Sequence, residues 1–225
     1  MHKVRNQHKI IAESFALSAF FFIFAREAYT TIRQMSKNLY IISGCNGAGK
    51  TTASYTVLPE ILDCREFVNA DEIARGLSPF NPEGMAIEAG RLMLRRIEEL
   101  LTKSETFSIE TTLATKSYLN LVHRAQSKGY RVNILFFWLR TPELAIQRVA
   151  ERVQHGGHNI PEDVIRRRYL AGITNLFRLF ISEVDYWGIY DNSEQPRIKI
   201  ASGNKGKQIE IFDEKLYKTI QEYVR

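Results

Sequence analysis

The chain has 225 residues, enough for one sizeable hydrophobic core with at most a small additional lobe. Its 44% hydrophobic and 25% charged residues are typical of an ordinary globular protein. The net charge of +6 is concentrated at the start, because residues 1–38 contain six Lys and Arg against two Glu, which leaves +2 for residues 39–225. This nearly neutral remainder disfavours nucleic acid as a partner of the folded domain.

The first 36 residues are predicted to be a leader outside the catalytic fold, which would occupy residues 37–225. Residues 14–25 are strongly apolar but shorter than the roughly 20 residues that a helix needs to cross a bilayer, so we expect no membrane span. Arg26 follows at once, and no clear cleavage site of a secretory signal is present. Met35 is a natural start. The leader is interpreted as a mis-assigned start, a peripheral helix or a weak membrane contact.

Residues 44–51 read Gly-Cys-Asn-Gly-Ala-Gly-Lys-Thr and fit the phosphate-binding pattern G-x-x-x-x-G-K-[ST] without a mismatch. An apolar strand is predicted before it at residues 39–43. A helix is predicted after it at residues 51–58, ended by Pro59. This strand, loop and helix are the context that the pattern requires.

Each residue type in this loop has a predicted task. The glycines let successive backbone N–H groups converge on the α- and β-phosphates of a nucleotide. Lys50 is expected to reach the β- and γ-phosphates, and the Thr51 hydroxyl to bind Mg²⁺. The predicted nucleotide-binding residues are Gly44, Cys45, Asn46, Gly47, Ala48, Gly49, Lys50, Thr51 and Thr52.

After the loop, short apolar strands alternate with amphipathic helices, as in a parallel sheet covered by helices on both faces. A three-layer α/β sandwich with a mostly parallel sheet is therefore predicted. Further strands are expected at residues 65–69, 105–110, 131–139, 189–191 and 198–201. Helices are expected at residues 82–101, 115–128 and 142–154, from Pro161 to about Asp185, and from Asp213 onward.

Two acidic residues follow predicted strands, where ligands of open α/β sheets bind. Asp71 could accept the proton of a substrate hydroxyl, or it could cap the helix that starts near Glu72. Glu110 could bind a substrate hydroxyl or reach Mg²⁺ through water; the alternatives are a cap or a surface ion pair. Thr111 is a weaker candidate for substrate binding.

The residues around Gly156 and Gly157 predict a helical lid, because two arginine-bearing helices flank this break. Arginine offers planar donors that neutralise charge on a transferred phosphoryl group. Arg152 and Arg168 are the chosen candidates, since Arg166, Arg167 and Arg168 cannot all face one site.

Three smaller features are interpreted in the same way. His155 and His158 flank the glycines, but no cysteine or carboxylate cluster accompanies them, which disfavours a metal site. Residues 191–193 either line an adenine pocket or form a simple turn. The two cysteines, Cys45 and Cys64, favour a reducing, cytoplasmic setting, because a disulfide between them would stiffen the phosphate loop.

With these motifs in this order, the chain resembles the zeta-toxin family of P-loop kinases, in particular short bacterial members, over roughly residues 37–193. The resemblance implies that Lys50 and Thr51 handle ATP and Mg²⁺ and that Asp71 is the general base. It also implies that Glu110 positions the substrate and that arginines, here Arg152 and Arg168, clamp the triphosphate. Toxins of this family phosphorylate a UDP-linked N-acetylamino sugar, and an antitoxin protein is a partner by resemblance only.

The sequence thus predicts an ATP-dependent kinase that transfers the γ-phosphoryl group to a hydroxyl of a small molecule. Two alternatives stay open. The first is a nucleotide-binding switch without enzymatic activity. The second is a polynucleotide-end kinase, which the nearly neutral charge of residues 39–225 disfavours.

Overall fold

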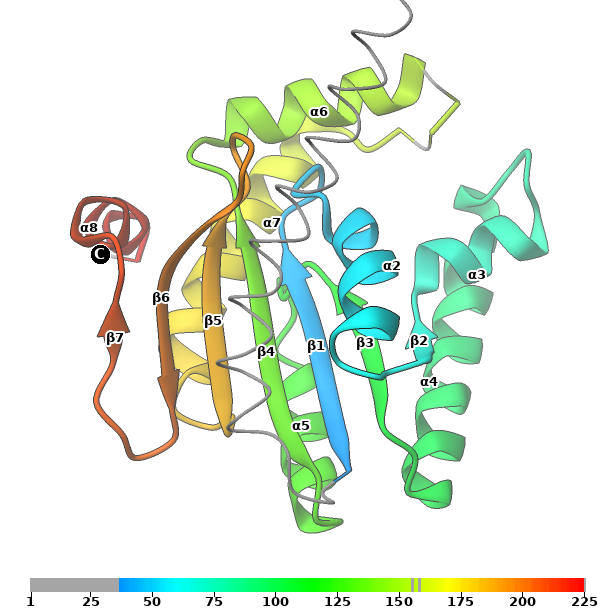
Figure 1. Ribbon diagram of the computed structural model, residues 1–225. Coiled ribbons are helices and arrows are strands. Elements are labelled where there is room, and N and C mark those ends of the chain that lie inside the picture. Colours follow the sequence, from blue (N-terminus) through cyan, green and yellow to red (C-terminus); the bar gives the residue numbers. More distant parts are fainter. Residues whose placement is uncertain (1–36, 155, 158, 225) are drawn as a thin grey trace, which may run out of the picture.

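A computed structural model describes residues 37–154, 156–157 and 159–224 (Figure 1). The leader expected at residues 1–36, and both histidines of the glycine break, His155 and His158, lie outside the described residues. None of the helices in the described part is long and apolar enough to cross a membrane.

The centre of the molecule is a seven-stranded sheet with the order β2-β3-β1-β4-β5-β6-β7. The first five of these strands are parallel, and β6 and β7 are antiparallel to their neighbours. The predicted mostly parallel sheet is therefore confirmed. The strands are β1 (Asn38–Gly44), β2 (Glu66–Val68), β3 (Phe107–Thr111), β4 (Arg131–Trp138), β5 (Tyr186–Asp191), β6 (Ile198–Asn204) and β7 (Glu210–Ile211).

Helices cover both faces of this sheet, which makes the predicted three-layer sandwich (Figure 1). In the view of Figure 1, α2 lies in front of the strands, α5 and α7 lie behind them, and α6 lies above their carboxyl ends. The helices are α2 (Lys50–Glu60), α3 (Ala70–Leu77), η1 (Glu83–Met85), α4 (Ala86–Lys103), α5 (Tyr118–Ser127), α6 (Pro142–Gln154), α7 (Glu162–Asn175), the π-helical η2 (Leu176–Phe180) and α8 (Glu214–Glu222).

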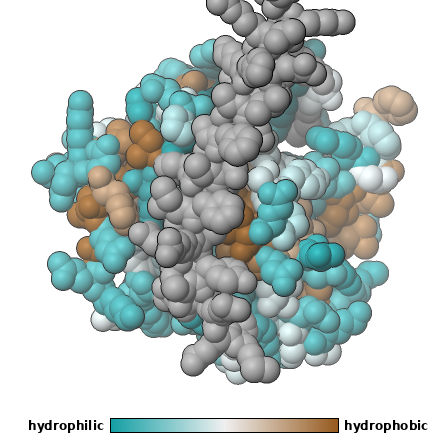
Figure 2. All heavy atoms as spheres, in the orientation of Figure 1, coloured by the Kyte–Doolittle hydropathy of each residue, from teal (hydrophilic) through white to brown (hydrophobic). Residues whose placement is uncertain are grey.

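The hydrophobic core lies between the sheet and its helices. The central strands β1 and β4 are buried along almost their whole length. Outside the core, Figure 2 shows mainly hydrophilic residues with separate hydrophobic patches toward both sides of the molecule.

Two expected helix ends were wrong. Pro59 was expected to end the first helix, but it lies inside α2, which continues to Glu60 because a proline in the last turn removes only one backbone donor. The helix expected to reach about Asp185 ends at Phe180, the last residue of η2. The Asp185 carboxylate instead accepts a hydrogen bond of 2.8 Å from the Val132 N–H at the start of β4. Asp185 therefore lies directly before β5 and is bound to the neighbouring strand β4, outside the helix.

Gly44 ends β1 at a position where only glycine fits. Its φ is +138°, and a Cβ atom there would lie 2.0 Å from the carbonyl oxygen of Phe137 on β4. The chain can therefore leave the sheet and enter the phosphate loop only because this residue has no side chain.

We predict that Gly44→Ala lowers the free energy of unfolding by about 3 kcal/mol or more, because backbone strain and steric overlap add. Urea unfolding measures this change. The matched control is Gly90→Ala inside α4, where an added Cβ would meet no atom within 4 Å. The control should gain about 0.5–1 kcal/mol. Equal stability of the two variants would contradict the prediction.

Candidate functional site

The predicted phosphate loop connects β1 to α2 and curls back on itself. Gly47 and Gly49 have φ values of +77° and +74°, in the left-handed region that glycine adopts readily. The Ala48 N–H donates to the Cys45 carbonyl over 3.2 Å. The loop places the amino end of α2, with its positive dipole, at the carboxyl edge of the sheet, an arrangement that suits a bound anion.

Lys50 is buried directly beneath this loop. Its Nζ donates to the Cys45 carbonyl over 3.0 Å and lies 3.7 Å from Oε1 of Glu110. The two side chains are only 8% and 9% exposed. The surface ion pair considered for Glu110 is therefore wrong, since its partner is the buried lysine of the phosphate loop.

Three polar side chains contact the Glu110 carboxylate at the end of β3. Oε2 accepts hydrogen bonds from the Thr51 hydroxyl at 2.8 Å and from Nδ2 of Asn69 at 2.9 Å, and Lys50 approaches the other oxygen. Burial raises the pKa of Glu110, an effect that the nearby Lys50 charge opposes.

The Thr51 hydroxyl and the Glu110 carboxylate are oxygen ligands of the kind that Mg²⁺ prefers, so these residues fit a magnesium ion. Elsewhere in the described chain, no group of three or more His, Cys, Asp and Glu is arranged to hold a metal. A metal at this point would therefore depend on Thr51, Glu110 and the oxygens of a bound ligand.

Asn69, rather than Asp71, caps α3. Its Oδ1 accepts hydrogen bonds from the backbone N–H groups of Asp71 at 2.8 Å and Glu72 at 3.4 Å. The capping role considered for Asp71 is therefore wrong, because the helix already begins at Ala70 and Asp71 is its second residue. Asp71 is left with an exposed carboxylate beside the phosphate loop.

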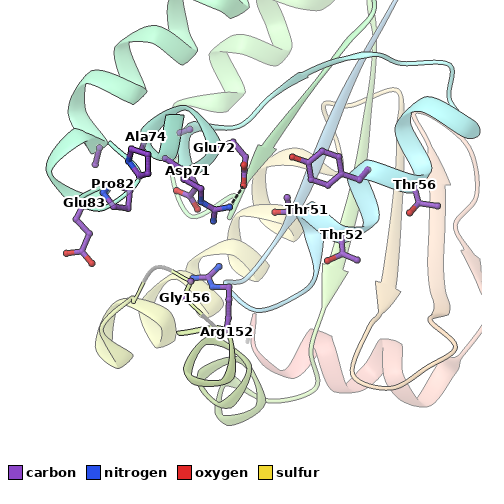
Figure 3. Close-up of a pocket in the computed structure, with 16 residues that line it drawn as sticks. Thr51, Thr52, Thr56, Asp71, Glu72, Ala74, Pro82, Glu83, Arg152 and Gly156 are labelled. Carbon is purple, nitrogen blue, oxygen red and sulfur yellow. Dashed lines mark ion pairs between the residues drawn. The ribbon is translucent and has the colours of Figure 1, made fainter. Parts of the chain in front are cut away.

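Two cavities meet at Asp71. The larger, of about 830 Å³, lies between α2, α3 and the end of α6, with Thr51, Thr52 and Arg152 in its wall (Figure 3). The second, of about 570 Å³, lies against β3, α4 and the start of α5. It is lined by Asn46, Lys50, Asp71, Glu110, Thr111 and Arg168.

The arginines of the predicted lid take different positions. Arg152 extends from α6 toward the larger cavity (Figure 3), and a Cβ on Gly157 would lie 2.5 Å from its Cγ. Nη1 of Arg168 lies 3.5 Å from Oδ1 of Asn46 in the phosphate loop, whereas Arg166 pairs with Glu143 on α6 at 2.6 Å. Of the three consecutive arginines, Arg168 is the one that lines either of these two cavities.

The remaining predicted residues have mostly structural contacts. The Thr111 hydroxyl accepts a hydrogen bond from the Leu113 N–H at 3.1 Å, although the residue also lines the second cavity. Both cysteines are buried and free, and burial raises the pKa of the Cys45 thiol to about 11. The thiol is therefore protonated at neutral pH, and Cys45 serves the loop through its carbonyl.

One contact to the loop was missed in the sequence. Residues 191–193 form the simpler of the two expected structures, a turn in which the Ser193 N–H donates to Oδ1 of Asp191 at 2.9 Å. Within this turn, Nδ2 of Asn192 donates to the Ala48 carbonyl at 2.7 Å. No local pattern could reveal this contact, because the two residues are 144 positions apart.

We predict opposite pH dependences for two isosteric substitutions. A raised pKa in the folded state means that Glu110 binds its proton more tightly there, so its contribution to stability falls as pH rises from its usual 4.5 through the raised value. The difference in stability between Glu110→Gln and the unmodified protein should therefore shift in favour of the variant as pH rises over that interval, whatever constant cost the lost partner of Lys50 adds.

The control is the exposed Glu143, whose pKa is lowered by its hydrogen bond with Arg166. Its contribution is present above 4.5 and is lost as pH falls through the lowered value, so Glu143→Gln should lose stability relative to the unmodified protein as pH rises. Urea unfolding between pH 3 and 7 measures both trends. Parallel curves for Glu110→Gln and the unmodified protein would contradict the prediction.

The fold is shared with two solved structures. The complex of AvrRxo1-ORF1 with AvrRxo1-ORF2 and ATP matches with a TM-score of 0.66 and 17% identity, over 98% of this chain and 73% of that one. A structure from the PezAT chromosomal toxin–antitoxin system of Streptococcus pneumoniae matches with a TM-score of 0.60 and 17% identity, over 92% of this chain and 86% of that one. At this identity the likeness shows the fold alone.

Sequence comparison adds a relative and a family. An uncharacterized protein of Haemophilus influenzae is 27% identical over 135 residues, which are 60% of this chain and 94% of that protein. The model of the family described as Zeta toxin matches residues 24–198, which include the phosphate loop, Asp71, Glu110 and both lid arginines. The chain therefore belongs to the zeta toxin family and has the α/β fold of a P-loop kinase.

Proposed function

We propose that this protein transfers the γ-phosphoryl group of ATP to a hydroxyl group of a small molecule. The observation that carries the proposal is the position of Asp71, a carboxylate beside the phosphate loop that lines both cavities. An acceptor bound in either cavity would therefore lie near this carboxylate. Membership of a family of P-loop kinases supports the same reaction class.

The phosphates of ATP would lie against the loop at residues 44–51. Backbone N–H groups of the loop and the amino end of α2 favour negative charge there, and Lys50 supplies a buried positive charge. A related fold has been solved with ATP, which supports this choice of nucleotide. We further propose that Thr51 and Glu110 hold Mg²⁺, which would neutralise charge on the β- and γ-phosphate oxygens.

In the proposed reaction, Asp71 accepts the proton of the acceptor hydroxyl while the hydroxyl oxygen forms a bond to the γ-phosphorus. The bond from that phosphorus to the β–γ bridging oxygen breaks, and ADP leaves with the electron pair. Arg152 and Arg168 would offset the negative charge on the transferred group, because each lines one of the two cavities that meet at Asp71.

The acceptor would occupy the cavity of about 570 Å³, where Glu110 and Thr111 could position its hydroxyl groups. Family resemblance makes a UDP-linked N-acetylamino sugar the first acceptor to test. An antitoxin is a further proposal, supported by the relative from a toxin–antitoxin system. We place the activity in the cytoplasm, where ATP is abundant and where the two free cysteines would stay reduced.

The direct test is incubation of the purified protein with γ-labelled ATP and a metabolite extract, in parallel with the UDP-linked N-acetylamino sugar. A labelled phosphomonoester is the expected product. Release of labelled phosphate with no labelled metabolite would refute the kinase proposal. ATP binding without any turnover would instead favour the nucleotide-binding switch.

We predict that Lys50→Ala lowers kcat/KM by about 100-fold or more, because a buried donor to the transferred phosphates is lost. Steady-state assays with the identified acceptor measure this effect. The substitution also leaves the Glu110 carboxylate without its cation, so thermal unfolding must confirm that the variant is folded. Lys103→Ala, at the carboxyl end of α4, is the control and should retain full activity.

We predict that Asp71→Asn keeps its affinity for ATP but loses about 10²–10⁴-fold in phosphoryl transfer, because the amide cannot accept the hydroxyl proton. Calorimetry measures the binding and the labelling assay measures the transfer. Glu72→Gln is the matched control, since Glu72 is the adjacent acid in the same cavity and pairs with Arg75 at 3.4 Å. Unimpaired transfer by Asp71→Asn would rule out its role as the base.

A further inference from the structure

We propose that Asn192 is a positioning residue that holds the phosphate loop in its anion-binding orientation through the carbonyl of Ala48. The proposal rests on the proposed function, since it takes the phosphates of ATP as the ligand of the loop. Asn192 follows β5, far from the loop in sequence, and its side chain is almost completely buried, with the residue 3% exposed.

The contact between Asn192 and the loop is close and directional. Nδ2 of Asn192 donates to the Ala48 carbonyl over 2.7 Å, within the range of a good hydrogen bond. The same nitrogen would lie 2.6 Å from a Cβ on Gly49, so the amide rests directly on the peptide that joins Ala48 to Gly49. Glycine at position 49 is therefore needed for this approach as well as for its φ of +74°.

The planarity of the peptide makes this contact functional. In a trans peptide the C=O and the following N–H point in opposite directions. A hydrogen bond that fixes the Ala48 carbonyl toward Asn192 therefore turns the Gly49 N–H away from Asn192. In a loop that binds phosphates through converging N–H groups, one such group is thereby held in place before the ligand arrives.

Two arginines fix the orientation of Asn192 itself. Nε of Arg197 donates to Oδ1 of Asn192 over 2.8 Å, and Nε2 of Gln195 donates to the same oxygen over 3.3 Å. A rotation of the side-chain amide by 180° would break these bonds together with the bond to Ala48. Nη1 of Arg148 donates to the Asn192 backbone carbonyl over 2.8 Å. Arg148 lies on α6, one turn before Arg152. Asn192 therefore connects the phosphate loop to the helix of the predicted lid.

Asn192 is not among the described residues that line the two cavities at the site. We therefore assign it an indirect effect on nucleotide binding, through the loop, and no contact with the acceptor. An interaction of this kind holds the ground state and the transition state equally, so its loss should raise KM for ATP and leave kcat nearly unchanged.

The test compares Asn192→Asp and Asn192→Ala with the unmodified protein by calorimetry with Mg²⁺ and ATP. Asn192→Asp keeps the shape but replaces the donor by an oxygen that repels the Ala48 carbonyl, so ATP affinity should fall by about 10- to 100-fold. Asn192→Ala removes the donor without adding charge and should lose about tenfold. Asn204→Asp, at the end of β6, is the control and should bind ATP as the unmodified protein does.

Binding by both Asn192 variants within about twofold of the unmodified protein would overturn the proposal. A fall in kcat at unchanged KM for ATP would overturn it too, since that pattern indicates a role in the chemical step. If the unmodified protein gives no heat with ATP, the proposed function fails instead, which separates the two outcomes.

A measurement on the unmodified protein covers the case in which the variants do not fold. The side-chain amide of Asn192 should exchange its hydrogens slowly in NMR spectra and should shift when ATP is added. Exchange as fast as that of the side-chain amide of Asn204, with no shift on addition of ATP, would contradict the positioning role.

Discussion

The site depends on the burial of a positive charge under a loop of backbone amides. The buried Lys50 has partners there, because Glu110 lies 3.7 Å away and the Cys45 carbonyl accepts a hydrogen bond from its Nζ. A buried ion pair contributes little net stability, since desolvation opposes the attraction, but removal of one partner leaves an uncompensated charge and costs about 3–5 kcal/mol. Lys50 and Glu110 therefore depend on each other for stability in the buried site. The loop conformation depends on this pair, because Lys50 also donates to the loop carbonyl of Cys45.

The order of the strands makes this pair possible. β3 lies beside β1 in the sheet, although β2 comes between them in the chain, and Ser43 is aligned with Thr111. The end of β3 consequently lies next to the start of α2, where Glu110 meets Thr51. Asn69 then connects the end of β2 to the same carboxylate and caps α3, so that one buried amide sets the positions of both Glu110 and the Asp71 backbone.

The loop is held from its other side as well. Asn192, supported by Arg148 and Arg197, donates a hydrogen bond to the carbonyl of Ala48, while Lys50 donates one to the carbonyl of Cys45. Two carbonyls of the loop, those of Cys45 and Ala48, thus accept hydrogen bonds from buried side chains of the protein. These contacts fix the backbone of the loop before a ligand is bound, as the proposed binding of phosphates requires.

The sequence by itself determined the phosphate loop, the alternation of strands and helices, and the family, because these depend on local patterns of glycine, charge and apolar residues. It also predicted Asp71 and Glu110 as site residues, since polar groups after apolar strands lie at the carboxyl edge of the sheet. Only the tertiary structure decided which residue caps α3, which of Arg166, Arg167 and Arg168 lines a cavity at Asp71, and that Asn192 donates to the loop. Each of these depends on a hydrogen bond or on packing between particular side chains, and no periodic pattern in the sequence encodes such contacts.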